Sequence, residues 1–104
     1  MSGSDNTSET VRVITVTDTA TANDFDIYAK GITGNIVLNL PAVASIQPGR
    51  PYSIVKDAAA FTVTIDGAAS ETINGATTLV LAASAFHGAT IVNTGTEWIA
   101  RALY

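Results

Sequence analysis

From Val11 onward, the apolar residues of this chain recur mostly at every second position, and this period constrains the fold more than any other feature. The segment Val11-Arg12-Val13-Ile14-Thr15-Val16-Thr17 shows the pattern. Successive side chains of a β-strand point to opposite faces, so a period of two is typical of a strand with one buried face. The sequence therefore predicts an all-β chain.

Eight segments with this alternation, or with a short apolar run, are separated by residues that favour tight turns. The predicted strands are 11–17, 25–29, 35–40, 52–56, 61–66, 77–82, 89–93 and 97–103. The turns between them contain Gly31, Gly34, Gly49, Gly67, Gly75 and Gly95. Glycine adopts positive φ angles without steric cost, as tight turns require. One helical turn is expected at 42–46, after Pro41.

Short strands at regular spacing, with turn residues between them, are typical of a sandwich or a barrel. We expect an antiparallel β-sandwich, with the jelly roll as one candidate arrangement. The expected inward-facing core residues are Val13, Phe25, Ile27, Ile36, Leu38, Leu40, Ile54, Val63, Ile65, Leu79, Leu81, Ile91 and Ile99.

The length of 104 residues allows one domain with one core, predicted at 11–104. Residues 1–10 are small and polar, and we expect them to form a flexible arm that either frays or clasps a neighbour. The chain has no cysteine, so no disulfide offsets its small size. Association with other subunits is the remaining source of stability.

The strand surfaces carry unusually little charge. Charged residues make up 13% of the chain and hydrophobic residues 47%, whereas an average soluble domain has roughly 25% charged residues. Uncharged β-surfaces with free edges favour further pairing, so the composition predicts a subunit of an assembly. We expect self-association and a protein partner.

Charge and hydropathy also exclude several partners. The formal net charge of −4 opposes binding to a phosphate backbone, so we expect no nucleic acid. The apolar runs are far shorter than the roughly 20 residues that span a bilayer, so we expect no membrane. The first five residues lack the basic start and apolar run of a secretory signal, and none is expected.

No arrangement of residues predicts catalysis, a cofactor or a metal ion. His87 is the only histidine, and neither an orienting acid nor a nucleophile is identifiable for it. We interpret it as a turn or interface residue. The acids Asp18, Asp24, Asp26, Asp57, Asp66 and Glu71 do not have the spacing of a calcium loop. We therefore expect no enzymatic activity.

The aromatic residues allow two interpretations. Trp98, Tyr28, Tyr52 and Tyr104 are candidates for a surface on which a sugar ring stacks. Burial in a core or interface is the favoured interpretation, because aromatic side chains dominate both environments.

Residues 36–104 have an ordered pattern of strands and turns. A strand leads into Leu40-Pro41, and an aromatic strand from Gly49 ends at Lys56-Asp57. The turn Glu71-Thr72-Ile73-Asn74-Gly75-Ala76 follows, and the pattern closes with Asn93-Thr94-Gly95-Thr96-Glu97-Trp98. This order resembles a β-domain of tailed-bacteriophage virion proteins, which include capsid decoration (cement) proteins and tail-fibre modules. The loop after Lys56-Asp57 is shorter here than in those proteins.

The resemblance implies a homotrimer on the outer surface of an icosahedral capsid, where it binds the major capsid protein and stabilises the shell. The expected shell contacts lie in the first segment, at Ser2, Thr7, Thr10, Val11 and Val13. The alternative is a tail- or head-fibre module that recognises a host-surface glycan. A small hydrolase acting on cell-surface sugars is a third hypothesis.

Overall fold

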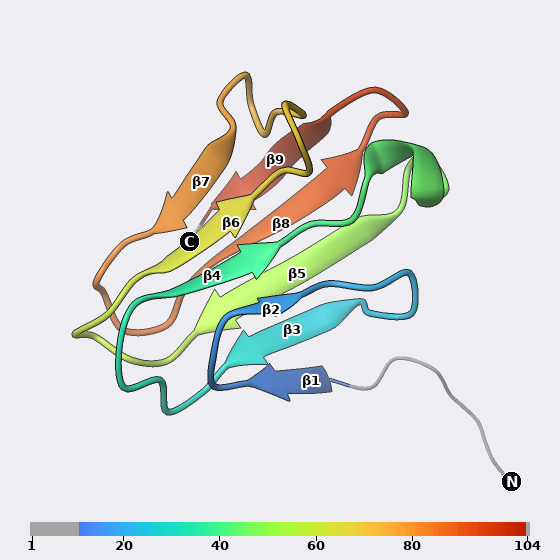
Figure 1. Cartoon of the computed structure of the whole chain (residues 1–104). Coiled ribbons are helices and arrows are strands. Elements are labelled where there is room, and N and C mark those ends of the chain that lie inside the picture. Colours follow the sequence, from blue (N-terminus) through green and yellow to red (C-terminus); the bar gives the residue numbers. More distant parts are fainter. Residues whose placement is uncertain (1–10, 104) are drawn as a thin grey trace, which may run out of the picture.

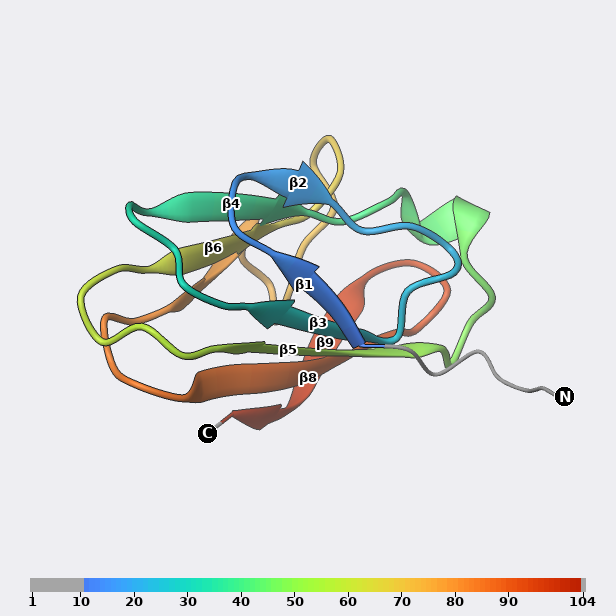
Figure 2. The ribbon, with the colours of Figure 1, turned by 90° about the horizontal axis from the view of Figure 1, so that it is seen from below.

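The computed structural model describes residues 11–103, which form two β-sheets in separate layers (Figures 1 and 2). Sheet A has the strand order β1-β3-β5-β8-β9, and sheet B has the order β2-β4-β6-β7. The strands are β1 (Val11–Ile14), β2 (Asp18–Thr19), β3 (Asp26–Ala29), β4 (Ile36–Asn39), β5 (Pro51–Lys56), β6 (Val63–Asp66), β7 (Thr78–Leu81), β8 (His87–Asn93) and β9 (Trp98–Leu103). The predicted all-β class is confirmed.

The chain alternates between the layers over its first six strands. Strands β1, β3 and β5 belong to sheet A, and β2, β4 and β6 belong to sheet B. Neighbouring strands within each of these sets are parallel. The chain forms a strand of the other sheet before it returns, so it enters the next strand of the same sheet in the same direction. Strands β7, β8 and β9 then add antiparallel pairs.

The prediction of an antiparallel arrangement, and with it the jelly roll, is wrong. Both sheets are mixed, with parallel pairs at one side and antiparallel pairs at the other. The sequence pattern predicts short, glycine-containing connections but not which strands they place side by side. Most of these connections cross from one sheet to the other. The period of two in the apolar residues is the same whether a connection crosses between sheets or joins two neighbouring strands, so it does not distinguish these arrangements.

The strand positions follow the sequence pattern closely. Each predicted segment contains a strand, although the segment 11–17 forms only β1, and β2 follows at Asp18. The helical turn predicted at 42–46 is a 3₁₀ helix at Val43–Ser45. Residues 11–103 contain no helix long and apolar enough to cross a bilayer.

The core lies between the two sheets and is built mainly from isoleucine, leucine and valine. Tyr52 and Trp98 are the largest fully buried apolar side chains, and their ring centroids lie 5.7 Å apart. Most of the predicted core is confirmed, with Phe25 and Leu79 only half-buried. Val13 and Ile99 are wrong: they are 54% and 38% exposed, because they lie on the outer face of sheet A.

Two polar side chains fix the crossing from β4 to β5. The amide nitrogen of Asn93 donates to the carbonyl oxygens of Val43 and Ile46, at 3.0 and 2.9 Å. The Glu71 carboxylate accepts a 2.9 Å hydrogen bond from the N–H of Val43 at the start of the 3₁₀ helix. Because Asn93 is fully buried, its two hydrogen bonds satisfy carbonyl oxygens that water does not reach.

Candidate functional site

The outer face of sheet A is the least polar surface formed by the described strands. The pairing places Val13, Tyr28 and Val55 in one row across β1, β3 and β5. The residues of this face are Val11, Val13, Asp26, Tyr28, Pro51, Ser53, Val55, Thr90, Val92, Ile99 and Ala102. Asp26 is the charged residue of this set, and the exposed Arg101 lies next to Ala102 at the irregularity in β9. The Ser53 and Thr90 hydroxyl oxygens lie 3.2 Å apart and satisfy each other.

The outer face of sheet B has a different character. Its residues on β4, β6 and β7 are Val37, Asn39, Thr64, Asp66, Thr78 and Val80. Threonine, asparagine and aspartate dominate this set, and water solvates such side chains without a partner. The outer face of sheet A is therefore the stronger candidate for an interaction surface.

A hollow of about 320 Å³ lies on this face; we call it the sheet A hollow. Its lining residues are Val11, Asp26, Ile27, Tyr28, Ser53 and Val55. A smaller hollow of about 170 Å³ adjoins it through Asp26 and Ser53 and extends to Phe25 and Pro51. The lining offers aliphatic side chains, one tyrosine ring, one hydroxyl and one carboxylate. It can accept an apolar group or stack on a ring.

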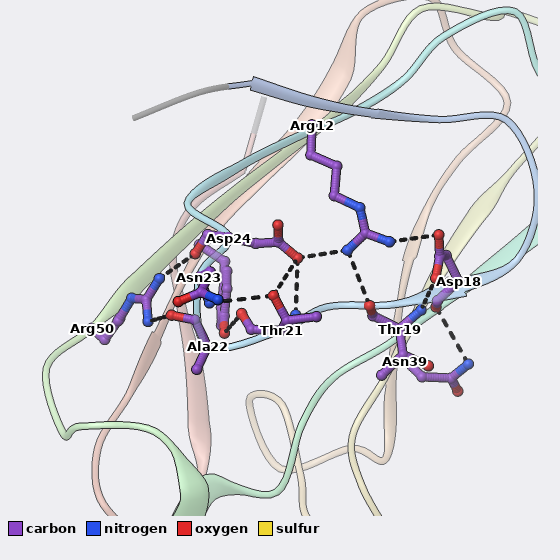
Figure 3. A network of polar contacts seen from close by, with 10 residues as sticks. Arg12, Asp18, Thr19, Thr21, Ala22, Asn23, Asp24, Asn39 and Arg50 are labelled. Atoms are coloured by element: carbon purple, nitrogen blue, oxygen red, sulfur yellow. Dashed lines mark hydrogen bonds and ion pairs between the residues drawn. The ribbon is translucent and has the colours of Figure 1, made fainter. Parts of the chain in front are cut away.

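An ion-pair cluster organises the connection between β1 and β3 (Figure 3). The Arg12 guanidinium contacts the Asp24 carboxylate at 2.7 Å and the Asp18 carboxylate at 2.6 Å. The hydrogen bond to Asp24 is the main cause that raises the pKa of Arg12. The pKa of Asp18 is lowered chiefly by the hydrogen bond from the backbone N–H of Thr19, and next by Arg12. These contacts hold a surface connection in place, and they use the acids that a metal site would need.

A second arginine holds the same connection from the other side. Arg50 donates hydrogen bonds to the carbonyl oxygens of Ala22 and Asp24, and its guanidinium lies 4.2 Å from the Phe25 ring centroid. The Tyr52 hydroxyl donates to the Thr21 carbonyl oxygen at 2.7 Å. Burial is the main cause that raises the pKa of Tyr52. These contacts tie the connection between β2 and β3 to the start of β5.

A buried lysine joins two loops at the opposite end of the sheets. Lys56 occupies an inward-facing position at the end of β5, and its side chain is fully buried. Its ammonium donates to the carbonyl oxygens of Ala58 and Ser84, at 2.6 and 2.5 Å. Burial is the main cause that lowers the pKa of Lys56.

The loop at residues 82–86 presents an exposed aromatic side chain. Phe86 is 66% exposed and has a φ of 54°, a conformation that bulky residues rarely adopt. Figure 1 shows this loop, between β7 and β8, at the same end of the sheets as the loop between β5 and β6. Phe86 is thus displayed at a rim of the molecule.

The structure does not group the histidine and the acidic residues that the sequence analysis considered for catalysis or metal binding. His87 lies at the start of β8, and its buried Nδ1 has no hydrogen-bond partner among the described residues. Asp57 accepts a hydrogen bond from the N–H of Gly31, and Asp66 lies on the outer face of sheet B. Within residues 11–103, no three histidine or acidic side chains are grouped as a metal ion would require.

The aromatic candidates separate into two groups. Tyr52 and Trp98 are fully buried, which confirms the favoured interpretation and leaves neither ring free to stack on a sugar. Tyr28 lines the sheet A hollow. Tyr104 lies outside the described residues.

The predicted shell contacts are only partly covered by the described residues. Val11 and Val13 lie on the edge strand β1 and are 51% and 54% exposed. Ser2, Thr7 and Thr10, and the rest of the predicted arm at 1–10, lie outside the described residues. Sequence reasoning did not identify Phe86 or Lys56. The only sequence feature that sets Phe86 apart is its position after a run of alanine and serine residues. Nothing in the sequence around Lys56 indicates that its side chain is buried.

Comparison with known proteins adds no relative: no family model and no curated protein matches the chain.

Proposed function

We propose that this chain is a structural subunit of a tailed-phage virion, a decoration protein that binds the outer surface of the icosahedral capsid as a homotrimer. The observation that carries the proposal is the outer face of sheet A, where mostly apolar side chains extend over five strands beside two charged residues, Asp26 and Arg101. An apolar face of this extent marks a protein–protein contact. The virion assignment rests on the sequence pattern of residues 36–104.

The mechanism is linkage between binding and assembly. A protein that binds the assembled shell, and not the free subunits, lowers the free energy of the shell by an amount set by its concentration relative to its Kd. Such a protein needs a rigid fold and complementary surfaces, and no reacting groups. The described residues fit this requirement, because their charged side chains mostly serve to hold loops in place.

The shell contact is proposed for the first segment, at Ser2, Thr7, Thr10, Val11 and Val13, with the major capsid protein as partner. Strand β1 supports this choice because it is an edge strand with two exposed valines. An edge strand has a partner on one side only and can pair with a second chain. Deletion of residues 1–10 is expected to abolish attachment to shells and to leave the melting temperature unchanged. Unchanged attachment would overturn this contact.

The copy number of the chain in purified particles tests the function itself. Quantitative mass spectrometry is expected to find a number comparable to that of the major capsid protein. A handful of copies per particle would place the chain in a tail or head fibre, and its absence from particles would overturn the virion assignment.

A second candidate function is glycan recognition by a fibre module, and one observation favours it. Tyr28, Asp26 and Ser53 line the same hollow, and together they offer a ring for stacking and oxygen atoms for hydrogen bonds to sugar hydroxyls. A glycan array separates the two functions, because a decoration protein gives no reproducible signal. A signal that disappears in Tyr28→Ala would support the fibre module.

The hydrolase hypothesis has the least support. Asp18 and Asp24 both bind Arg12, and the carboxylates of Asp57 and Glu71 accept hydrogen bonds from backbone N–H groups elsewhere. We propose that the chain is not an enzyme, and incubation with host polysaccharide is expected to release no reducing ends.

A further inference from the structure

We propose that Phe86 of one copy inserts into the sheet A hollow of a second copy, and that this contact joins the subunits of the oligomer. The inference rests on the homotrimer of the proposed function and specifies its interface. It commits to a second copy of this chain as the occupant of the hollow.

The inserting residue is exposed at a cost to its backbone. Phe86 is 66% exposed and has a φ of 54° in a loop whose other members are alanine and serine. An exposed phenylalanine gains nothing from this position in the monomer. Strained backbone of this kind persists where the surrounding structure enforces it, and it is concentrated at binding sites.

The loop is also held in place before any partner arrives. The Lys56 ammonium bonds to Ser84, two residues before Phe86, and to Ala58 in the neighbouring loop. This buried side chain links the 82–86 loop to the end of β5, a central strand of sheet A. A pre-organised aromatic anchor loses little conformational entropy on binding, which is the property of an interface hot spot.

The hollow has the size and chemistry to receive a phenyl ring. A cavity of about 150 Å³ holds a benzene molecule, and the sheet A hollow measures about 320 Å³. Tyr28 and Val55 supply aromatic and aliphatic contacts. Residues 82–86 carry no charge, so they bring no second carboxylate toward Asp26, and the contact requires the Asp26 carboxylate to keep its access to water.

The area of the face is compatible with a stable contact. Five strands at about 4.8 Å spacing and six residues at about 3.3 Å rise give a face of about 480 Å². Each partner of a standard interface buries about 800 Å². The face therefore supplies about half of the area needed on the copy that receives Phe86, whereas the 82–86 loop belongs to the surface of the other copy.

The positions of the two surfaces are compatible with the ring of the proposed homotrimer. Phe86 lies in the loop before β8, whereas the hollow lies over β1, β3 and β5. Different patches of the two copies therefore meet, either twice in a reciprocal two-fold dimer or once per pair in a heterologous contact. Heterologous contacts close into rings when the rotation between copies permits, and a homotrimer is such a ring.

Two variants that each destroy one side of the contact test the proposal. Phe86→Ser removes the inserting ring, and Val55→Arg fills the hollow with a charged side chain. Val80→Arg is the matched control, because Val80 is a 49% exposed strand valine on the outer face of sheet B. The oligomeric mass of the full chain is measured by sedimentation velocity over a range of concentrations.

The wild type and Val80→Arg are expected to form the same oligomer. Phe86→Ser and Val55→Arg alone are each expected to associate at least about 30-fold more weakly, the effect of losing a hot-spot residue. An equimolar mixture of these two variants is expected to form a heterodimer, because it retains one intact contact between Phe86 and a hollow. A monomeric wild type, an unchanged Phe86→Ser oligomer or a mixture without heterodimer would each overturn the inference.

Phe86→Gly separates loss of the contact from loss of the fold. Glycine adopts a positive φ without strain, so this variant is expected to melt at the same or a higher temperature while its association is lost. Retained association of Phe86→Gly would contradict the proposal. A monomeric wild type whose hollow binds a glycan would assign the hollow to a sugar instead.

The copy number in particles keeps this inference distinct from the proposed function. If Phe86→Ser still associates in solution and the chain is abundant on shells, the interface is wrong and the decoration function stands. If the contact behaves as expected in solution and the chain is absent from particles, the interface stands and the decoration function is wrong.

Discussion

The Nζ atom of Lys56 lies 2.5 Å from the carbonyl oxygen of Ser84, although the two residues are 28 positions apart. The lysine comes from sheet A, and the serine lies in the loop by which the chain returns from sheet B. This single contact couples the end of a central strand to the loop that presents Phe86. Stability of the fold and presentation of the loop therefore depend on the same side chain.

Lys56→Met is expected to destabilise the fold by about 2 kcal/mol, because the carbonyl oxygens of Ala58 and Ser84 lose their buried donor. The methionine side chain retains most of the apolar packing. The free energy of unfolding in urea measures the effect. Lys30→Met is the matched control, since Lys30 is exposed, and its unfolding free energy is expected to change by less than about 0.5 kcal/mol. Equal effects of the two substitutions would show that Lys56 has no special structural role.

Asn93→Ala is expected to cost about 3 kcal/mol, because it removes three hydrogen bonds and leaves two backbone groups without a partner. The carbonyl oxygen of Ile46 and the N–H of Gly95 lose their partner, whereas the carbonyl oxygen of Val43 still accepts from the N–H of Ile46. Thermal and urea unfolding measure the loss. Asn23→Ala serves as the control at an exposed position and is expected to be nearly neutral. A stable Asn93→Ala variant would mean that water replaces the amide.

Gly67→Ala is expected to destabilise the protein by about 1–3 kcal/mol, the usual cost of inserting a methyl group where there is no space. A Cβ atom at Gly67 would lie against the carbonyl oxygen of Glu71, closer than Cβ atoms approach other atoms in proteins. Gly34→Ala is the control, because nothing lies within 4 Å of a Cβ there. Comparison of the two melting temperatures checks the prediction, and similar values would contradict it.

Acid is expected to weaken the ion pair between Arg12 and Asp18. The pKa of Asp18 is lowered from 3.8 in the folded state, so its contribution to stability is fully present above that value. The contribution is lost as pH falls from 3.8 through the lowered pKa of the folded state. Asp18→Asn has no carboxylate and lacks this contribution. The difference in unfolding free energy between wild type and Asp18→Asn is therefore expected to shrink as pH falls from 5 to 2, and a constant difference would contradict the prediction.

Local features of the fold follow from the sequence because they depend on neighbouring residues. Alternation located the strands, and Pro41 located the 3₁₀ helix that begins at Val43. Gly31, Gly49, Gly75 and Gly95 have the positive φ angles expected of turns. Gly67, also expected to have a positive φ, does not have one. Glycine is required there because the carbonyl oxygen of Glu71 leaves no space for a Cβ atom.

The candidate site was less predictable, because it combines residues from several strands. Val13 and Ile99 were assigned to the core, since alternation does not identify which of two apolar faces is buried. The sheet A hollow joins Val11, Tyr28 and Val55, which come from three parallel strands. The spacing of these three residues in the sequence does not indicate that they lie together.

The sequence by itself determined the all-β class, the approximate strand positions and the small number of charged residues. The apolar period and the turn residues are properties of short segments, and the composition does not depend on the fold. Only the tertiary structure decided that strands alternate between two mixed sheets, that sheet A has the apolar outer face, and that Lys56 is buried beneath the loop of Phe86. The physical reason is that pairing, sidedness and burial depend on which distant segments meet. Tight turns and crossings between layers use the same small residues, so a single chain pattern is compatible with both.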